Sequence, residues 1–158
     1  MRPEIDSIYG NRLRVRACGI CWSDDKLLMV NHIGLSEDSF WAPPGGGVEF
    51  GESVVETLER EFREETGLAV EPGRFMCVCE YLSRPLHAIE LFFEVTVQGG
   101  SLAAGKDPEM ASNRQLIASV AFLPFQRIRE LSTGQRHALF EIYTSVKDLK
   151  SASGYWKI

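Results

Sequence analysis

The sequence predicts an α/β/α sandwich around a mixed β-sheet. Segments with a strand-like apolar pattern lie on both sides of one amphipathic helical segment, and further helical segments follow the last strand. Helices that cover both faces of a mixed sheet form this layered architecture. At 158 residues the chain is long enough for one sizeable core and short for two. We therefore expect a single domain over residues 1–158.

The first two predicted strands form a hairpin. Apolar-rich runs cover residues 13–22 and 26–32, and the Ser-Asp-Asp triplet at residues 23–25 is typical of a turn. We expect two neighbouring strands here, joined by a tight connection.

A loop, a short strand and a capped helix are expected next. The PPGGG sequence at residues 43–47 predicts a loop whose backbone can approach another group closely. Residues 48–50 alternate like a short strand. Ser53, followed three residues later by Glu56, matches a helix N-terminal capping box, and Gly67 is typical of a helix C-terminus. The helix should therefore lie between Ser53 and Gly67.

Three carboxylates lie on one face of this helix. At about 100° per residue, Glu61, Glu64 and Glu65 stack at positions i, i+3 and i+4. Like charges at this spacing destabilise a helix by roughly 0.2–0.5 kcal/mol per pair. A hard divalent cation would compensate this repulsion.

A run of glutamates on a helix more often marks a solvated face. The predicted apolar stripe consists of Val54, Val55, Leu58 and Phe62. The predicted solvated face, opposite to it, consists of Glu56, Glu59, Arg60 and Arg63. Glu61 and Glu65 border the apolar stripe instead, where an unpaired carboxylate is costly. The pattern therefore favours a metal site over plain solvation.

Strand patterns recur downstream of this helix, and two helical patterns follow them. The strands are expected at residues 74–83, 89–97 and 116–123, with Pro124 ending the last, and the helices at residues 125–131 and 135–147. The longer helix should turn four side chains inward, namely Ala138, Leu139, Ile142 and Val146. Residues 98–113, rich in glycine, alanine and polar side chains, predict a loop inside the domain.

Composition restricts the expected location and partners. The formal net charge is −5, and neutralising a nucleic-acid backbone needs a basic surface, so nucleic acid is not an expected partner. The first residues contain no apolar signal region, and no apolar run approaches the ~18 residues that span a bilayer. We expect a cytoplasmic protein without a membrane partner.

Four cysteines raise the question of a structural zinc site. Cys18 and Cys21 have CxxC spacing, and Cys77 and Cys79 form a second pair. Both pairs lie in predicted strands, where side chains at i and i+3 point to opposite faces. The pattern favours reduced, buried thiols over zinc.

The segment 46–68 resembles the signature of the Nudix hydrolases. That signature is a glycine, five residues, a glutamate, seven residues, and then Arg-Glu-hydrophobic-any-Glu-Glu-any-Gly-hydrophobic. The matching residues, with no change in spacing, are Gly46, Glu52, Arg60, Glu61, Phe62, Glu64, Glu65, Gly67 and Leu68. This pattern is long and restrictive. Residues 40–44 also resemble the strand that leads into the signature.

The resemblance implies Mg²⁺-dependent hydrolysis of a pyrophosphate linkage in a nucleotide, with Mn²⁺ as a substitute for Mg²⁺. Such phosphoryl transfer depends on positioning and on charge neutralisation, which carboxylates with bound metal provide. By analogy with the signature, Glu64 and Glu65 are the first choices as metal ligands. Glu61 either shares the metal or acts as the general base. The Gly46 carbonyl adds a ligand, and Glu52 assists.

Arg60 and Glu109 receive separate roles. We expect Arg60 to point away from the metal face and to form an orienting salt bridge with Glu52. Some family members take the general base from a later loop, where Glu109 is the candidate. The alternative is that Glu109 is an ordinary surface carboxylate.

Candidate substrate-binding residues are basic and aromatic. Arg12, Arg14 and Arg16 should share one face of the first strand, where Arg14 and Arg16 are candidates to bind phosphate. Cations on an exposed edge strand equally promote solubility. The aromatic candidates for stacking on a base are Phe40, Trp41 and Tyr81, with a place in the core as the alternative.

The loop expected after the strand at residues 74–83 carries Arg84, Pro85 and His87. This region often separates Nudix substrate classes, and Arg84 is a further substrate-binding candidate. Pro85 resembles a downstream proline of ADP-ribose hydrolases, although it lies a residue or two later in the chain.

Two classes of function remain open. The first is a pyrophosphohydrolase of ADP-ribose or a related nucleotide, with a house-cleaning nucleoside triphosphate hydrolase as the rival enzyme. The second is a Nudix-fold module that senses a nucleotide without hydrolysing it. The complete set of signature carboxylates favours an enzyme with a nucleotide substrate. The oligomeric state, including a homodimer, stays open.

Overall fold

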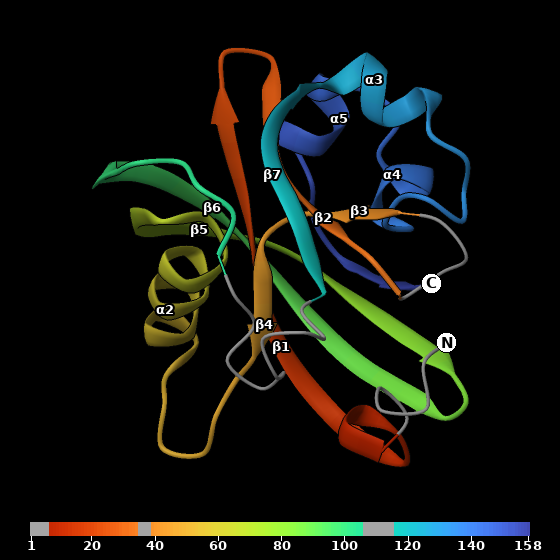
Figure 1. The fold of residues 1–158 in the computed structure, drawn as a ribbon. Helices are drawn as coiled ribbons and strands as arrows, with labels where there is room; N and C mark the ends of the chain where they lie inside the picture. Colours follow the sequence, from red (N-terminus) through yellow and green to blue (C-terminus); the bar gives the residue numbers. More distant parts are fainter. Residues whose placement is uncertain (1–6, 35–38, 106–115) are drawn as a thin grey trace.

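The computed structural model describes residues 7–34, 39–105 and 116–158, in which helices flank a mixed eight-stranded sheet (Figure 1). The strands are β1 (Arg12–Ser23), β2 (Lys26–His32), β3 (Phe40–Ala42), β4 (Gly45–Gly47), β5 (Leu68–Ser83), β6 (Leu86–Gly100), β7 (Ile117–Pro124) and β8 (Tyr155–Lys157). The helices are α2 (Val54–Thr66), α3 (Phe125–Glu130), α4 (Leu139–Ile142) and α5 (Val146–Lys150). The predicted α/β class is confirmed.

The sheet has the strand order β3-β2-β1-β6-β5-β8, with β4 paired to β1 and β7 paired to β2. Strands β1 and β6 run parallel, as do β5 and β8, whereas the other pairs are antiparallel. The β1–β2 and β5–β6 connections are hairpins. The β1–β6 pairing places the first strand in the middle of the sheet, where its residues Arg14 and Arg16 line the cavity described in the next section.

Two buried clusters cover opposite faces of the sheet. On one face, Leu58 and Phe62 of α2 pack against β1, β2 and β5, and the Phe62 ring lies against Gly19. On the other face lie α3, α4 and α5 (Figure 1). Their apolar side chains belong to the second cluster. Burying a side chain as large as that of Phe62 stabilises a fold by roughly 1.5–3 kcal/mol. Among the helices of the described residues, α2 alone contributes buried side chains to the first cluster, whereas three helices contribute to the second.

The structure confirms the predicted ends of α2. The Glu56 N–H donates to the Ser53 hydroxyl, and the Glu56 carboxylate accepts from the Ser53 N–H, which completes the capping box. Gly67 ends the helix with a left-handed φ of 75°. The predicted apolar stripe is wrong at Val55, which is exposed, and Thr57 is buried in its place.

The short strand before α2 is not where we expected it. Residues 48–50 are irregular, and the glycines predicted to form a loop make strand β4, paired with Arg16, Ala17 and Cys18 of β1. A Cβ on Gly45 would lie 2.3 Å from the Ala17 carbonyl oxygen. Gly45 therefore lies closer to β1 than a residue with a side chain could.

The predicted helix over residues 135–147 is also wrong. Before α4, residues 133–135 form a turn and Arg136 makes an isolated bridge with Trp41, whose carbonyl accepts from the His137 N–H and whose N–H donates to the Gln135 carbonyl. The chain breaks again at Tyr143, and the Ser145 hydroxyl caps α5 by accepting from Asp148. The short helix expected after Pro124 is confirmed as α3, and β8 was not predicted.

All four cysteines are buried and free. Cys18 belongs to one apolar cluster and Cys21 to the other, so the two thiols lie on opposite faces of β1, as the strand pattern predicted. Cys77 and Cys79 join the cluster of Cys18.

The loop predicted over residues 98–113 begins later than expected, because β6 continues to Gly100. Residues 101–105 are irregular, and the rest of that segment lies outside the described residues. None of the helices in the described ranges is long and apolar enough to cross a membrane.

Candidate active site

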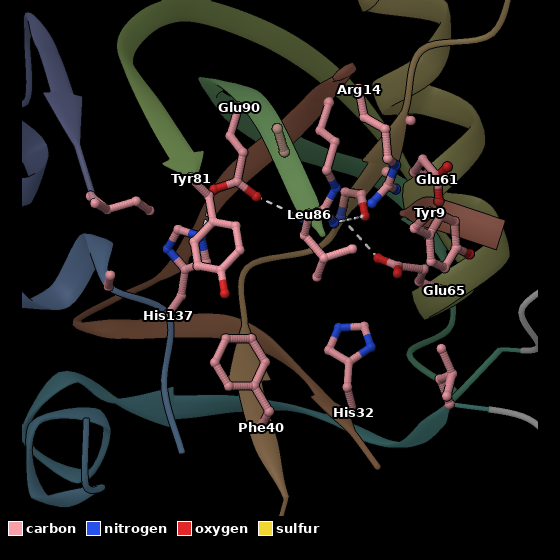
Figure 2. Close-up of a pocket in the computed structure, with 18 of the residues that line it drawn as sticks. Tyr9, Arg14, His32, Phe40, Glu61, Glu65, Tyr81, Leu86, Glu90 and His137 are labelled. Atoms are coloured by element: carbon pink, nitrogen blue, oxygen red, sulfur yellow. Dashed lines mark hydrogen bonds and ion pairs between the residues drawn. The ribbon is translucent and has the colours of Figure 1, made fainter. Parts of the chain in front are cut away.

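A cavity of about 490 Å³ opens between α2, the β1–β4 pair and the β5–β6 hairpin. Figure 2 shows Glu61 and Glu65 on one side of it and the rings of Tyr81, Phe40 and His137 on the other. The first side contains the glutamates and glycines singled out in the sequence, and we call it the glutamate end. The second side we call the aromatic end.

At the glutamate end, α2 presents its carboxylates to strand β4. Glu61 and Glu64 both accept from the Arg60 guanidinium, at 2.8 and 3.2 Å. Glu65 is buried and accepts from the Gly45 N–H at 2.9 Å. Burial raises the pKa of Glu61, although the positive charge of Arg60 opposes that rise.

The expected salt bridge between Arg60 and Glu52 is present, but the expected direction of Arg60 is wrong. Its Nε and Nη2 atoms donate to both oxygens of Glu52, at 2.7 and 2.9 Å. The same guanidinium reaches Glu61, Glu64 and the Gly47 carbonyl. A long side chain can curl over the helix surface toward the carboxylates, which a helical wheel of Cα positions does not represent.

Glu52 anchors this arrangement from the turn before α2. Hydrogen bonds from Arg60 and from the Thr57 hydroxyl hold it, and they lower the pKa of Glu52 to about 2. Glu52 therefore stays ionised at neutral pH and keeps Arg60 beside the other carboxylates.

The residue types at this end suit a hard divalent cation. Carboxylate and carbonyl oxygens are the ligands that Mg²⁺ prefers. A Cβ on Gly46 would lie 2.1 Å from Glu61 Oε1, so only glycine leaves space for that carboxylate against the β4 backbone. Among the described residues, however, no three His, Cys, Asp or Glu side chains already meet in a metal-binding geometry. Arg60 contacts Oε1 of Glu61 and Oε2 of Glu64, so a cation would bind through the second oxygen of each carboxylate.

A network of buried charges, which the sequence analysis missed, lies between the two ends. Arg16 donates to Glu90 at 2.6 Å and to the Gly45 carbonyl at 3.1 Å. His137 Nε2 lies 2.7 Å from the other Glu90 oxygen. Burial alone would raise the pKa of Glu90, but its contacts with His137 and Arg16 lower it to about 2. Glu90 is thus a buried anion in the wall of the cavity.

The two arginines expected to bind phosphate have different surroundings. Arg14 lines the cavity and stacks on the Tyr9 ring, 4.1 Å from its centroid. Arg16 donates its hydrogen bonds to Glu90 and to the Gly45 carbonyl, so its role differs from that of Arg14. Arg14 keeps its place as the phosphate-binding candidate.

Two of the other substrate-binding candidates lie outside the cavity. Trp41 packs against the core, and its neighbour Phe40 lines the cavity, because successive strand residues face opposite sides. Arg84 is exposed in the β5–β6 turn, next to Pro85, and neither residue lines the cavity. Tyr81 and His87 do line it.

His32 is a further cavity residue that the sequence did not single out. Burial, together with the positive charge of Arg16, lowers the pKa of His32 to about 4. It therefore presents a neutral imidazole to the cavity at physiological pH.

Comparison with known families agrees with this geometry. The model of the NUDIX domain matches residues 10–143, which include strands β1 to β7 and helices α2, α3 and α4. The chain belongs to the Nudix family. Glu52, Glu61, Glu64 and Glu65, brought together at the glutamate end, are the carboxylates of its Nudix signature.

Two curated Nudix relatives are similar in sequence. An ADP-ribose pyrophosphatase of Methanocaldococcus jannaschii is 37% identical over 95 residues, which cover 59% of this chain and 56% of that protein. An 8-oxo-dGDP phosphatase of Mus musculus is 32% identical over 115 residues, which cover 70% of this chain and 35% of that protein. The chain thus spans little more than half, or less, of the length of these relatives.

Solved Nudix structures share the fold. A NUDIX hydrolase from Nitrosomonas europaea superposes with a TM-score of 0.70 at 21% identity, covering 90% of this chain and 93% of that one. A MutT NUDIX hydrolase from Burkholderia pseudomallei gives 0.66 at 20% identity, covering 89% and 98%. At such identities the likeness concerns the architecture.

The remaining candidate for a general base, Glu109, lies outside the described residues. The described chain resumes at Leu116, which lines the cavity and precedes β7. The choice between Glu109 and Glu61 therefore stays a prediction.

Proposed function

We propose that this Nudix protein hydrolyses the pyrophosphate linkage of a nucleoside diphosphate derivative, with ADP-ribose as the first candidate. The supporting observation is one cavity that joins a cluster of carboxylates and arginines to an aromatic, largely apolar end. A nucleotide has the same two-part chemistry, since its phosphates are anionic and its base is flat and stackable.

Glu61, Glu64 and Glu65, with the Gly46 carbonyl, would hold Mg²⁺ in this proposal. The bound ion would supply charge neutralisation at the phosphate oxygens and would lower the pKa of an attacking water. Arg60 orients Glu52, Glu61 and Glu64 from within the cluster. Arg14 binds phosphate at the rim, and Tyr81 with Phe40 contacts the nucleoside.

Two curated relatives support the substrate class, one being an ADP-ribose pyrophosphatase and the other an 8-oxo-dGDP phosphatase. Both substrates, ADP-ribose and 8-oxo-dGDP, are nucleoside diphosphates or their derivatives. A nucleoside triphosphate remains the second candidate, because the cluster of carboxylates serves either substrate.

A nucleotide panel with Mg²⁺ tests the proposal. ADP-ribose should yield AMP and ribose 5-phosphate, with inorganic phosphate released only after phosphatase treatment, whereas a triphosphate would yield a monophosphate and pyrophosphate. If kcat/KM is far higher for a dNTP than for every ADP-sugar, the substrate is a nucleoside triphosphate and not ADP-ribose. Nucleotide binding without any product would support the sensing module.

Arg14→Ala should raise KM for the preferred nucleotide by roughly 10-fold and leave kcat within about threefold. The reason is that a phosphate contact made equally in the ground state and the transition state changes KM alone. Steady-state kinetics measure both constants. Arg84→Ala, outside the cavity, is the matched control and should match the wild type. Unchanged KM in Arg14→Ala would remove Arg14 from the substrate site.

Glu109→Gln distinguishes the two candidate bases. If Glu109 activates water, Glu109→Gln should lower kcat by roughly 10²-fold with little change in KM. If activity stays within a few-fold of the wild type, Glu109 is a surface carboxylate and Glu61 takes the role. Single-turnover kinetics, which exclude product release, measure the effect on the chemical step.

A further inference from the structure

A continuous series of hydrogen bonds crosses the cavity wall from α4 to α2. It begins at the Leu139 N–H, which donates to His137 Nδ1 at 3.1 Å, and passes from His137 Nε2 to Glu90 at 2.7 Å. Arg16 then joins Glu90 to the Gly45 carbonyl, and the Gly45 N–H donates to Glu65. Residues from four separate parts of the chain thus end on one signature carboxylate.

The direction of the bonds around His137 follows from the Leu139 backbone N–H. Because the Leu139 N–H must donate, His137 Nδ1 accepts, and the proton of the neutral ring lies on Nε2, where it points at Glu90. Each Glu90 oxygen therefore has one donor, His137 on one side and Arg16 on the other. This leaves Arg16 held in place while its second nitrogen reaches Gly45.

We propose that Glu90 and His137 are positioning residues for the metal site. They hold Arg16, and Arg16 holds the carbonyl of Gly45, the β4 residue whose N–H donates to Glu65. The glutamate end therefore keeps its shape from the opposite side of the cavity. The inference rests on the proposed function, since it concerns the cation that Glu61, Glu64 and Glu65 would bind.

A purely structural role accounts less well for these residues. Burying an ion pair is often no more stabilising than packing apolar side chains of the same volume, because desolvation offsets the attraction. Glu90 is 2% exposed, and its two oxygens contact Arg16 and His137 rather than solvent. Direct partners of ligand residues typically change metal affinity or activity by 10–100-fold when removed, and Glu90 is connected to Glu65 through Arg16 and Gly45.

Direct Mn²⁺ binding to the substrate-free protein tests the inference, with the electron paramagnetic resonance signal of unbound Mn²⁺ as the readout. Glu90→Gln should bind Mn²⁺ at least 10-fold more weakly than the wild type. In steady-state assays its kcat should fall while KM for the nucleotide changes less than twofold. Mn²⁺ affinity within twofold of the wild type would overturn the proposal.

Glu80→Gln is the matched control. Glu80 also pairs with a histidine, His87, at 2.8 Å, on the same sheet. It has no bond to Arg16 or Gly45 in the described structure, so its removal should leave Mn²⁺ affinity unchanged. An equal loss in Glu80→Gln and Glu90→Gln would show a general effect of lost ion pairs and would refute the specific role.

Arg16→Lys decides the matter if Glu90→Gln does not fold. It keeps a positive charge beside Glu90, but one ammonium group lacks the fork that reaches both Glu90 and the Gly45 carbonyl. Weaker Mn²⁺ binding by this folded variant supports the proposal, and wild-type affinity contradicts it. Failure of the wild type itself to bind Mn²⁺ would instead reject the proposed function.

His137 is tested by two substitutions. His137→Leu removes the donor to Glu90, whereas His137→Gln keeps a side-chain N–H. We expect Mn²⁺ affinity to fall in the leucine variant and to be partly restored in the glutamine variant. Equal, wild-type affinities in both would remove His137 from the proposal.

Discussion

Glu64→Gln and Glu65→Gln should each lower kcat by roughly 10²-fold or more, and EDTA should abolish hydrolysis in the wild type. Both substitutions keep the size of the side chain and remove its charge, which is the property that a hard cation requires. Activity should return when Mg²⁺ or Mn²⁺ is added in excess of EDTA. Steady-state kinetics over a range of metal concentrations measure the effect.

The two variants should differ in how they fail. Glu65 is buried and accepts from the Gly45 N–H, and a glutamine oxygen accepts more weakly than a carboxylate, so Glu65→Gln should also weaken the contact between β4 and α2 and lower the melting temperature. Glu64 is partly exposed and contacts Arg60, so Glu64→Gln should leave the melting temperature near that of the wild type.

Glu59→Gln is the control on the same helix, because Glu59 does not line the cavity. It should keep full activity. Full activity of the wild type in a chelator, or equal losses in Glu59→Gln and Glu64→Gln, would contradict the metal assignment.

The sequence alone was sufficient for α2 because the signals that form it are local. Ser53, Glu56 and Gly67 cap the helix within a few residues of its ends, and the spacing of the glutamates places them on one side of it. Continuous apolar runs likewise located β1 and β2, because strands that are buried on both faces consist of such runs.

Elements that depend on distant partners could not be predicted in the same way. Strand β4 exists because glycines fit closely against β1, and β8 is a three-residue strand that exists only through its pairing with β5. The expected helix over residues 135–147 has helical apolar spacing, but its first residues pair with Trp41 instead. Periodicity identifies a preference, and tertiary contacts can override it.

The Glu90 network shows the same limit within the site. Glu90 is 74 residues from Arg16 and 47 from His137 along the chain, so only the folded sheet brings the three together. One signal was present, because Glu90 lies two residues before the buried Phe92 and so faces the core side of β6. A carboxylate in a buried strand position usually has a partner or a function.

Gly45→Ala should destabilise the fold and disable the glutamate end together. The added Cβ would lie 2.3 Å from the Ala17 carbonyl oxygen and 2.6 Å from the Cys18 Cα, and backbone atoms cannot move aside as a flexible side chain can. Overpacking of this kind costs up to about 3 kcal/mol of unfolding free energy. For a chain of this length that loss corresponds to a melting temperature lower by roughly 6–12 °C.

The same displacement should weaken the bond between the Gly45 N–H and Glu65, so Mn²⁺ affinity and kcat should fall in whatever fraction folds. Gly47→Ala, in the same strand, is the control for stability, because its Cβ would meet only an Arg14 nitrogen at 4.0 Å. Thermal unfolding followed by circular dichroism compares the two variants. Equal melting temperatures in Gly45→Ala and Gly47→Ala would contradict the prediction that the fold depends on the close contact between Gly45 and β1.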